Sequence, residues 1–438
     1  MVVDQRSTSG TRATAPGYRP LPSGAVAAPT LSELQALAAD ALGHLAADGQ
    51  VLAVWERRAG AAGVDARLQV LVTAVVGGRA GEATAASGGP DHLRRAARAA
   101  VLRARQARAW PAPPLPEPQA ARPHDGFDAA ALEATGGAER SDGLDVATEV
   151  IACRIAVAST AGVRAAEERS HAIVRAGGAA GGRRVEAVRA GVGPPDCAAA
   201  IGEALDLLAA GDGAPPPGGE GAVVLGPAAV ATVLDRLRPA FGIDLALGAG
   251  PLAGRAGQAV AAPAIDLADD AHHPRTLPRA HDAEGAPRRL VRLIERGVAR
   301  GGVLDSAAAA RAGAPSTGHA TRPAVLAPYP EHLVLAPGEA AGIAELAEGL
   351  DGGLYVPALA RDEEGGLVTR GAVRIAGGRL AAGVADVRVA IDPLAILAST
   401  EALTAERQLV PLRGHCPGGA GAAVVPALRT ARGLRIPG

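Results

Sequence analysis

The chain has 438 residues, a length that suits two or three domains. Apolar residues make up 48% of it and charged residues 20%, a balance that fits a globular protein and excludes a largely disordered one. The formal net charge of −1 gives no overall positive field to attract nucleic acid or an anionic membrane, so neither is expected as a partner.

Three features bear on the cellular compartment. The cysteines, Cys153, Cys197 and Cys416, are too few and too widely spaced for a disulfide framework. The first residues lack the apolar core of a secretory signal, and no apolar run approaches the roughly 18 residues that span a bilayer. The sequence therefore predicts a cytoplasmic protein with reduced thiols.

The N-terminal part opens with a segment rich in Ser, Thr, Gly and Pro, residues 1–29, which predicts a disordered tail. Thr30 and Glu33 then have the spacing of a helix capping box, and apolar residues continue at helical spacing to about residue 47. Strands are expected at 51–58 and 68–76, with glycine-rich turns between them.

A basic helix is expected over residues 92–110. Its arginines fall mostly on one side, opposite Leu93, Ala97 and Val101. A nucleic-acid site would also need stacking aromatic residues, and only Trp110 is available, so we interpret this side as a solvated helix face. The arginines are Arg94, Arg95, Arg98, Arg103, Arg105 and Arg108.

Two Pro- and Gly-rich segments divide the rest of the chain. The stiff linker 111–123 separates an N-terminal domain, 30–110, from a central domain, 124–212. The central domain should contain a helix over 128–137, strands at 148–160 and 169–178, and a helix over 196–211. A second boundary, 211–220, precedes a C-terminal domain over 221–438.

The C-terminal domain opens with a strand-to-helix unit and continues as short β-prone runs separated by glycine turns. This pattern favours antiparallel sheets with a few helices. The fold class expected for the whole chain is α+β. It comprises an N-terminal α/β domain, a central mixed segment and a C-terminal domain of mostly antiparallel sheet.

Five segments of the expected C-terminal domain, taken in their order and spacing, resemble the TldD/PmbA family of metallopeptidase-related proteins. They include a strand–GP–helix unit, a D-x-E-G-x-P segment followed by a strand pair, two further family signatures and a closing strand pair. The similarity is weaker before residue 221 but extends back to about Thr30. The five segments are residues 223–242, 279–306, 328–340, 353–359 and 415–436.

The resemblance implies a peptidase of two homologous chains, one of which carries zinc on an HExxH helix completed by a cysteine. In that motif two His share one helix face and bind the metal, and the Glu acts as general base. Here Asp235, Arg236 and Pro239 stand at the three positions. Arginine stays protonated and proline has no ligand atom, so a zinc site of the HExxH type cannot form on this helix. The pattern is similar to the TldE/PmbA branch, whose members pair with an active TldD-type chain.

Cys416 occupies a position that resembles the family's metal-ligating cysteine. Cys416, the adjacent His415 and Asp235 could together supply three metal ligands. Alternatively, Cys416 could be a packed thiol on a glycine-rich loop. The neighbouring His272 and His273, with His281 nearby, have a spacing more typical of a polar loop than of a metal site. We therefore expect no catalytic residue and no metal in this chain, with zinc in its partner.

The segment Asp282–Gly285 has a twofold interpretation. The resemblance places Asp282, Glu284 and Gly285 near the substrate cleft, at the mouth of a chamber shared with the partner. The bare sequence equally favours a β-turn at Gly285 before a strand. The substrate-cleft candidates are Asp282, Glu284, Gly285, Asp235 and Cys416.

Three functions remain open. The first is a non-catalytic subunit of a TldD-type heterodimer that cleaves extended or unstructured peptides. The second is a self-sufficient peptidase that uses Cys416 with a further group that the sequence does not identify. The third is a peptide-binding module of a peptide-maturation pathway. An HExxH homologue encoded nearby would favour the first, and whether this chain is itself an enzyme stays open.

Overall fold

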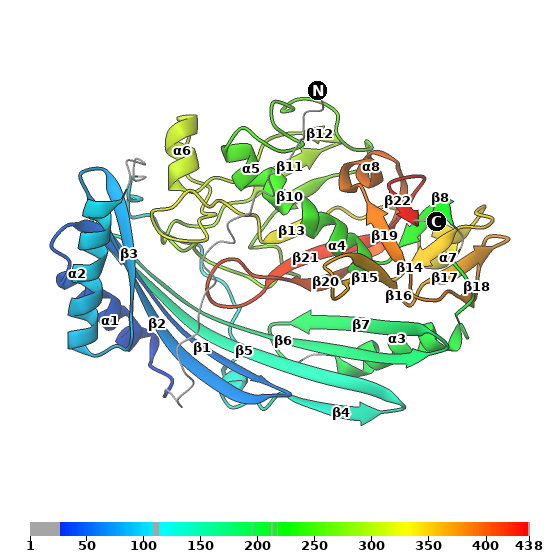
Figure 1. The fold of residues 1–438 in the computed structure, drawn as a ribbon, viewed down its shortest axis with the longest axis horizontal. Helices are drawn as coiled ribbons and strands as arrows, with labels where there is room; N and C mark the ends of the chain where they lie inside the picture. Colours follow the sequence, from blue (N-terminus) through cyan, green and yellow to red (C-terminus); the bar gives the residue numbers. More distant parts are fainter. Residues whose placement is uncertain (1–26, 108–113, 195, 212, 217, 437–438) are drawn as a thin grey trace, which may run out of the picture.

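A computed structural model describes residues 27–107, 114–194, 196–211, 213–216 and 218–436 (Figure 1). Most of the predicted tail, with Arg108 and Trp110 of the basic helix, lies outside these residues. The predicted linker is described from residue 114 onward and has no helix or strand up to residue 128.

A long seven-stranded antiparallel sheet forms one side of the molecule (Figure 1). Its order is β3-β2-β1-β5-β6-β7, with β4 paired to β5 beyond the end of β1. The strands predicted at 51–58, 68–76, 148–160 and 169–178 all belong to it. The bounds are β1 Asp48–Gly60, β2 Gly63–Val76, β3 Arg79–Ala85, β4 Gly137–Ser141, β5 Leu144–Ser159, β6 Arg164–Ala180 and β7 Arg183–Gly191.

This sheet joins the expected N-terminal and central domains. β1 pairs with β5 from Gln50 opposite Ser159 to Ala59 opposite Val150, across the proline-rich linker. Strands from both expected domains therefore lie side by side in one sheet.

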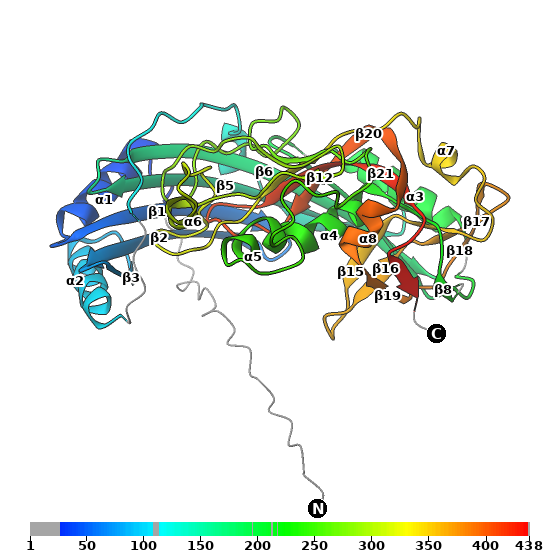
Figure 2. The same cartoon turned by 90° about the horizontal axis from the view of Figure 1, so that it is seen from above.

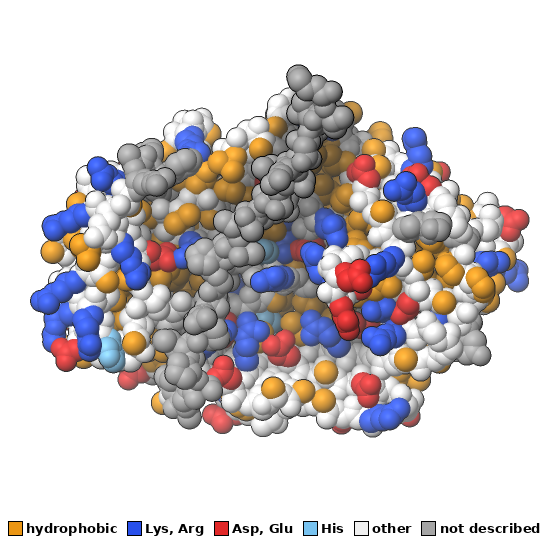
Figure 3. Space-filling view, in the orientation of Figure 1, with side chains coloured by type: hydrophobic (Ala, Val, Ile, Leu, Met, Phe, Trp, Pro, Cys, Tyr) orange, Lys and Arg blue, Asp and Glu red, His pale blue; other side chains and the backbone are white. Residues whose placement is uncertain are grey.

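Three helices accompany the sheet. α1 (Leu31–Gly43) begins with the predicted capping box, in which Thr30 Oγ1 accepts from the Glu33 N–H at 3.2 Å and Glu33 accepts from the Thr30 N–H at 2.7 Å. α2 (Pro90–Gln106) packs on β2 and β3, and its arginines lie on the exposed side, at the left of Figure 3. α3 (Cys197–Ala209) packs against β6 and β7.

The helix predicted over 128–137 is wrong. Only one 3-10 turn forms, η1 (Ala129–Leu132), which begins where the Asp128 side chain accepts from the Ala130 N–H. Gly136 lies against the Ala59 carbonyl, where a Cβ would come within 2.1 Å of the oxygen, and β4 begins at Gly137. The alanine-rich run is therefore too short to continue as a helix before the chain joins the sheet.

The C-terminal part contains a ten-stranded sheet and a five-stranded sheet that lie above the long sheet in Figure 1. The larger has the order β12-β11-β10-β13-β21-β9-β14-β17-β18 with β20 on β21, and the smaller has the order β15-β16-β19-β22-β8. Most pairs are antiparallel, and β13–β21 and β9–β14 are parallel. The α+β class is confirmed.

The strands of the larger sheet are β9 Val223–Leu225, β10 Leu267–Asp269, β11 Val291–Glu295, β12 Val298–Ala299, β13 His332–Leu335, β14 Leu354–Val356, β17 Val373–Ala376, β18 Arg379–Gly383, β20 Thr400–Leu412 and β21 Gly421–Thr430. Those of the smaller are β8 Gly219–Glu220, β15 Ala358–Arg361, β16 Leu367–Arg370, β19 Arg388–Ile391 and β22 Leu434–Ile436. The helical elements are α4 Pro227–Leu237, η2 Arg238–Phe241, α5 Ile243–Ala246, α6 Ser306–Ala312, α7 Ile343–Ala347 and α8 Pro393–Ala398.

The two closing strands do not pair with each other. β21 lies in the larger sheet beside β20, whereas β22 pairs with β19 and β8 in the smaller sheet. The strand pair expected after the D-x-E-G-x-P segment does form, between β11 and β12.

Parts of both faces of the long sheet are buried. α1 and α2 cover one face, which we call the outer face, with a cluster that includes Trp55 and many alanines. The C-terminal part lies against the other, inner face, where Ala283 packs with Ile155 and Val157 (Figures 1 and 2). No helix in the described part of the chain is long and apolar enough to cross a membrane.

Candidate functional site

A buried charged junction lies between the inner face of the long sheet and the C-terminal part. Its centre is Glu331, just before β13 and 2% exposed. One oxygen, Oε1, accepts from the backbone N–H groups of His415 at 2.5 Å and Cys416 at 2.8 Å. The carboxylate therefore fixes the start of the glycine-rich loop 413–420.

Two arginines neutralise Glu331. Arg288 Nη2 donates to Glu331 Oε2 at 3.1 Å, and Arg279 Nη1 lies 3.7 Å from the same oxygen. Burial alone would raise the pKa of Glu331, but the charges of Arg288 and Arg279 hold it well below its ordinary value. Glu331 is thus ionised at neutral pH.

The network continues into the long sheet through Glu167 on β6. Its Oε1 lies 3.4 Å from Arg279 Nε, and its Oε2 accepts from the Ala280 N–H at 2.6 Å. Burial raises the pKa of Glu167, and the neighbouring histidines and arginines, His281 first, more than reverse the shift. Two carboxylates and two arginines therefore tie together the two parts of the molecule.

Cys416 is enclosed by this network. Its thiol is 4% exposed, donates to the Ala320 carbonyl at 3.3 Å and lies 3.7 Å from Arg288 Nη2. Burial and the charge of Glu331 raise the pKa of the thiol to about 12, although Arg279 and Arg288 act in the opposite direction. The raised pKa opposes formation of the thiolate that a cysteine nucleophile uses.

The glycine-rich loop also contacts the inner face of the long sheet directly. Arg169 Nη1 and Cys153 Sγ both donate to the Gly418 carbonyl, at 3.0 and 3.1 Å. Gly419 has φ +112°, and a Cβ there would come within 2.2 Å of His171 Cε1. His171 Nε2 accepts from the Ala420 N–H at 3.2 Å, so its ring and the loop backbone fit together only because Gly419 lacks a side chain.

The helix that resembles the HExxH helix ends at Leu237, and the 3-10 turn Arg238–Phe241 follows because Pro239 cannot donate a helical hydrogen bond. Arg236 is exposed. Arg238 is fully buried, where it forms an ion pair with Asp235 and donates to the Arg413 carbonyl at 2.9 Å.

An aromatic ring completes the surroundings of Arg238. Its guanidinium carbon lies 4.8 Å from the centre of the Tyr329 ring, which stacks on His415 at 3.9 Å. A fixed organic cation, and not an open space, therefore adjoins Asp235.

These residues do not fit a zinc ion of the HExxH type. Asp235 is engaged by Arg238, Pro239 offers no ligand atom and the Cys416 thiol is enclosed against Ala320 and Arg288. Over the described ranges, no three His, Cys, Asp or Glu side chains form a group that could hold a metal ion. Asp235, His415 and Cys416 lie around one network but do not form a ligand set.

The other histidine candidates have separate surroundings. The His272 N–H donates to Asp270, whereas His273 Nε2 lies 3.5 Å from Arg407 Nη2. His281 is buried in the charged junction, with its Nδ1 2.9 Å from the Asp282 carbonyl oxygen. Adjacent histidines thus contact different neighbours, as a polar loop requires.

The Asp282–Gly285 segment is a tight turn, and its two carboxylates are buried in the isolated chain. Asp282 Oδ1 accepts from the N–H groups of Glu284 and Ala286, and its Oδ2 accepts from the Ala320 N–H at 2.9 Å. Gly285 has φ +77°, and a Cβ there would come within 2.6 Å of Val163. The β-turn interpretation therefore describes the local structure.

Sequence reasoning missed the charged junction. Arg279 and Arg288 flank the D-x-E-G-x-P segment and Glu331 lies in the segment 328–340, so the family resemblance marked both regions but gave these residues no role. A buried contact between Asp269 Oδ1 and His319 Nε2, at 2.9 Å, was missed in the same way.

Comparison with known proteins gives one family match and several similar structures. A family model described as the PmbA/TldA metallopeptidase C-terminal domain matches residues 218–436. TldE from Thermococcus kodakarensis is 20% identical, with a TM-score of 0.75 over 92% of this chain and 99% of its own. A candidate modulator of a DNA gyrase from Thermotoga maritima is 16% identical, with a TM-score of 0.68 over 89% of this chain and 94% of its own. At these identities the likeness concerns the fold alone, and no curated protein matches the chain.

Proposed function

The chain belongs to the PmbA/TldD family of metallopeptidase-related proteins, and we propose that it acts as a non-catalytic, TldE-like subunit of a cytoplasmic two-chain peptidase. The partner is a TldD-type homologue that carries an HExxH helix and its zinc. This chain supplies part of the enclosure around an extended peptide. The catalytic chemistry belongs to the partner.

The buried Arg238 carries this proposal. It pairs with Asp235 on the helix where an active chain would place its first metal ligand, and it is fixed there by the Arg413 carbonyl and the Tyr329 ring. A permanent positive charge beside Asp235 opposes a divalent cation. The neutral, enclosed Cys416 thiol supports the same assignment and argues against a self-sufficient cysteine peptidase.

The turn Asp282–Gly285 belongs to the proposal as a support for the cleft. Its carboxylates are buried in the isolated chain, so they would act on a peptide by holding the loops around them. Conservative changes are the right probes, because Asp282 accepts three backbone hydrogen bonds and its removal would disturb the turn itself.

Co-expression with an HExxH-bearing homologue from the same organism tests the proposal. We expect a stable heterodimer with about one zinc, bound by the homologue, and peptidase activity on unstructured peptides only when both chains are present. The matched control replaces the motif Glu of the homologue with Gln, which should keep assembly and abolish activity.

Three results would overturn the assignment. The partner role is wrong if the homologue alone cleaves as fast as the mixture. A tightly bound zinc in the isolated chain that is lost in Cys416→Ser would revive the self-sufficient enzyme. Peptide binding without any complex with the homologue would favour the peptide-binding module instead.

A further inference from the structure

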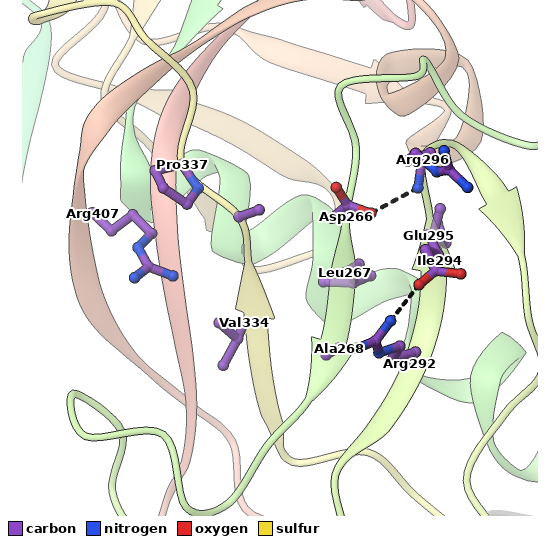
Figure 4. Close-up of a pocket in the computed structure, with 11 residues that line it drawn as sticks. Asp266, Leu267, Ala268, Arg292, Ile294, Glu295, Arg296, Val334, Pro337 and Arg407 are labelled. Carbon is purple, nitrogen blue, oxygen red and sulfur yellow. Dashed lines mark hydrogen bonds and ion pairs between the residues drawn. The ribbon is translucent and has the colours of Figure 1, made fainter.

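A pocket of about 480 Å³ lies on the face of the ten-stranded sheet, across β11, β10 and β13 (Figure 4). Ala268 pairs with Arg292 on one side and Val334 on the other, so these three side chains share the partly exposed face. Ala268 and Val334, together with Pro337, give the pocket a largely apolar floor. A volume of this size suits a small organic ligand.

Arginines stand on opposite sides of this floor. Arg407, from β20, borders one side, and Arg292 on β11 and Arg296 just after it border the other (Figure 4). The two acidic side chains of the pocket do not balance all of them. Asp266 accepts from the backbone N–H of Arg296 at 2.7 Å, and Glu295 pairs with Arg292 and Arg300.

Arg296 and Arg407 are the cations left over. Neither guanidinium forms an ion pair with a carboxylate in the described part of the chain. Arg407 instead donates weakly to the Leu335 carbonyl and lies 3.5 Å from His273 Nε2. Burial, and then the charge of Arg407, lower the pKa of His273, so the ring is a poor counter-charge for this arginine.

A third arginine increases the positive charge. Arg275 donates to the backbone carbonyl of Arg407, and its charge, after burial, lowers the pKa of Arg407. Like charges held close together on a half-buried surface repel each other and attract an anion. The guanidinium group also matches carboxylate, sulfonate and phosphate oxygens geometrically and stacks on flat apolar groups.

We propose that this pocket binds a small organic anion, with its apolar body on the floor at Ala268 and Val334 and its acidic group at Arg407 or Arg296. The pocket lies on the face of the sheet and not along its edge, so strand addition by a peptide is not its mode of binding. The site is independent of the peptidase role and uses no residue of the charged junction.

Calorimetric titration of the full chain tests the site with three probes of stated chemistry: 2-naphthoate, the neutral 2-naphthalenemethanol and inorganic phosphate. We expect saturable binding of 2-naphthoate at about one site per chain, weakened by added salt. The neutral alcohol and phosphate should each bind at least about tenfold more weakly, because each lacks one of the two recognised features.

Variants separate this site from general surface binding. One of the two variants Arg407→Gln and Arg296→Gln should weaken 2-naphthoate binding about tenfold, according to which arginine holds the acidic group, and the double variant should weaken it in either case. Thermal unfolding should be unchanged for the exposed Arg296. Arg379→Gln, an exposed arginine on β18 at the other end of the same sheet, is the matched control and should bind as the unmodified chain does. The proposal fails if the double variant of Arg296 and Arg407 binds normally, if the neutral alcohol binds equally well, or if no probe saturates.

Discussion

On β6, Glu167, Arg169 and His171 face the C-terminal part, whereas Ala166 and Ala172 face α1 and the outer cluster. The same strand therefore builds two different interfaces with alternate residues. The outer face is held by the burial of small apolar side chains. The inner face adds ion pairs and hydrogen bonds to loop backbone to its apolar packing around Ala283.

The difference predicts different responses to mutation. At an apolar interface, the loss of stability on mutation grows with the side-chain volume that is added or removed. A buried charge is stable only with its partners, and removing one partner leaves the other charge unpaired in a medium that solvates it poorly. The charged junction should therefore be the more sensitive of the two faces to a single side-chain change.

The largest effect is expected for Glu331→Ala. The change leaves the buried Arg279 and Arg288 without their shared carboxylate and removes the acceptor for two backbone N–H groups. We expect a loss of about 3–5 kcal/mol in the free energy of unfolding, measured by urea denaturation. Glu363→Ala, at an exposed position, is the control and should change it by less than about 0.5 kcal/mol. Equal midpoints for the two variants would show that the junction adds no stability.

The next-largest effect on stability is expected where the loop 413–420 contacts the long sheet. Gly419→Ala places a methyl group against the His171 ring at a positive φ, and we expect a loss of about 2–4 kcal/mol in the same measurement. Gly63 has φ +100° and open space around it, so Gly63→Ala measures the cost of the positive φ alone. This variant should lower the free energy of unfolding by only about 1–2 kcal/mol. Adding His171→Ala to Gly419→Ala should recover part of the loss. If Gly419→Ala costs no more than Gly63→Ala, the contact is not tight.

Local features of the fold could be predicted because they depend on neighbouring residues. The capping box at Thr30 and the long β-strands follow from spacing within a few residues. The pairing of β1 with β5 could not be predicted, because it joins residues about 100 positions apart whose local patterns allow other partners. The helix predicted at 128–137 was wrong because contact with Ala59 decides the conformation there.

The candidate site also has features that could be predicted from the sequence and features that could not. That Arg236 and Pro239 cannot serve an HExxH site is a property of the residue types and could be read from the sequence. The junction of Glu331, Arg279 and Arg288 depends on three segments that meet only in the folded chain. Arg238 was likewise missed, since nothing in its local pattern indicates that it is buried.

The outer face should show a smaller, purely steric response. Gly81 on β3 lies under α2, where a Cβ would come within 2.1 Å of the Ala104 backbone nitrogen. Gly81→Ala should push the helix away and lower the free energy of unfolding by about 1–3 kcal/mol, measured by urea denaturation. Gly137→Ala, in a strand position with open space, is the matched control and should have little effect. A neutral Gly81→Ala would mean that α2 can shift freely on the sheet.

The smallest effect, and the one most sensitive to pH, is expected for Glu284→Gln in the turn that meets the inner face. Burial, followed by the charge of Asp282, raises the pKa of Glu284 well above 4.5, and Asp305 adds to the shift. Above pH 4.5 the unfolded chain has lost this proton while the folded chain keeps it, so Glu284 makes folding less favourable as pH rises towards the folded pKa.

Glutamine cannot ionise, and it keeps an oxygen that can accept from the Ser306 N–H. Glu284→Gln should therefore gain stability over the unmodified chain as pH rises from 5 to 7, by at most about 1.4 kcal/mol per pH unit. Urea denaturation at pH 5, 6 and 7 measures the difference, with Glu363→Gln as the exposed control that should show no pH trend. A constant difference across this range would mean that Glu284 is ionised in the folded chain, contrary to its raised pKa.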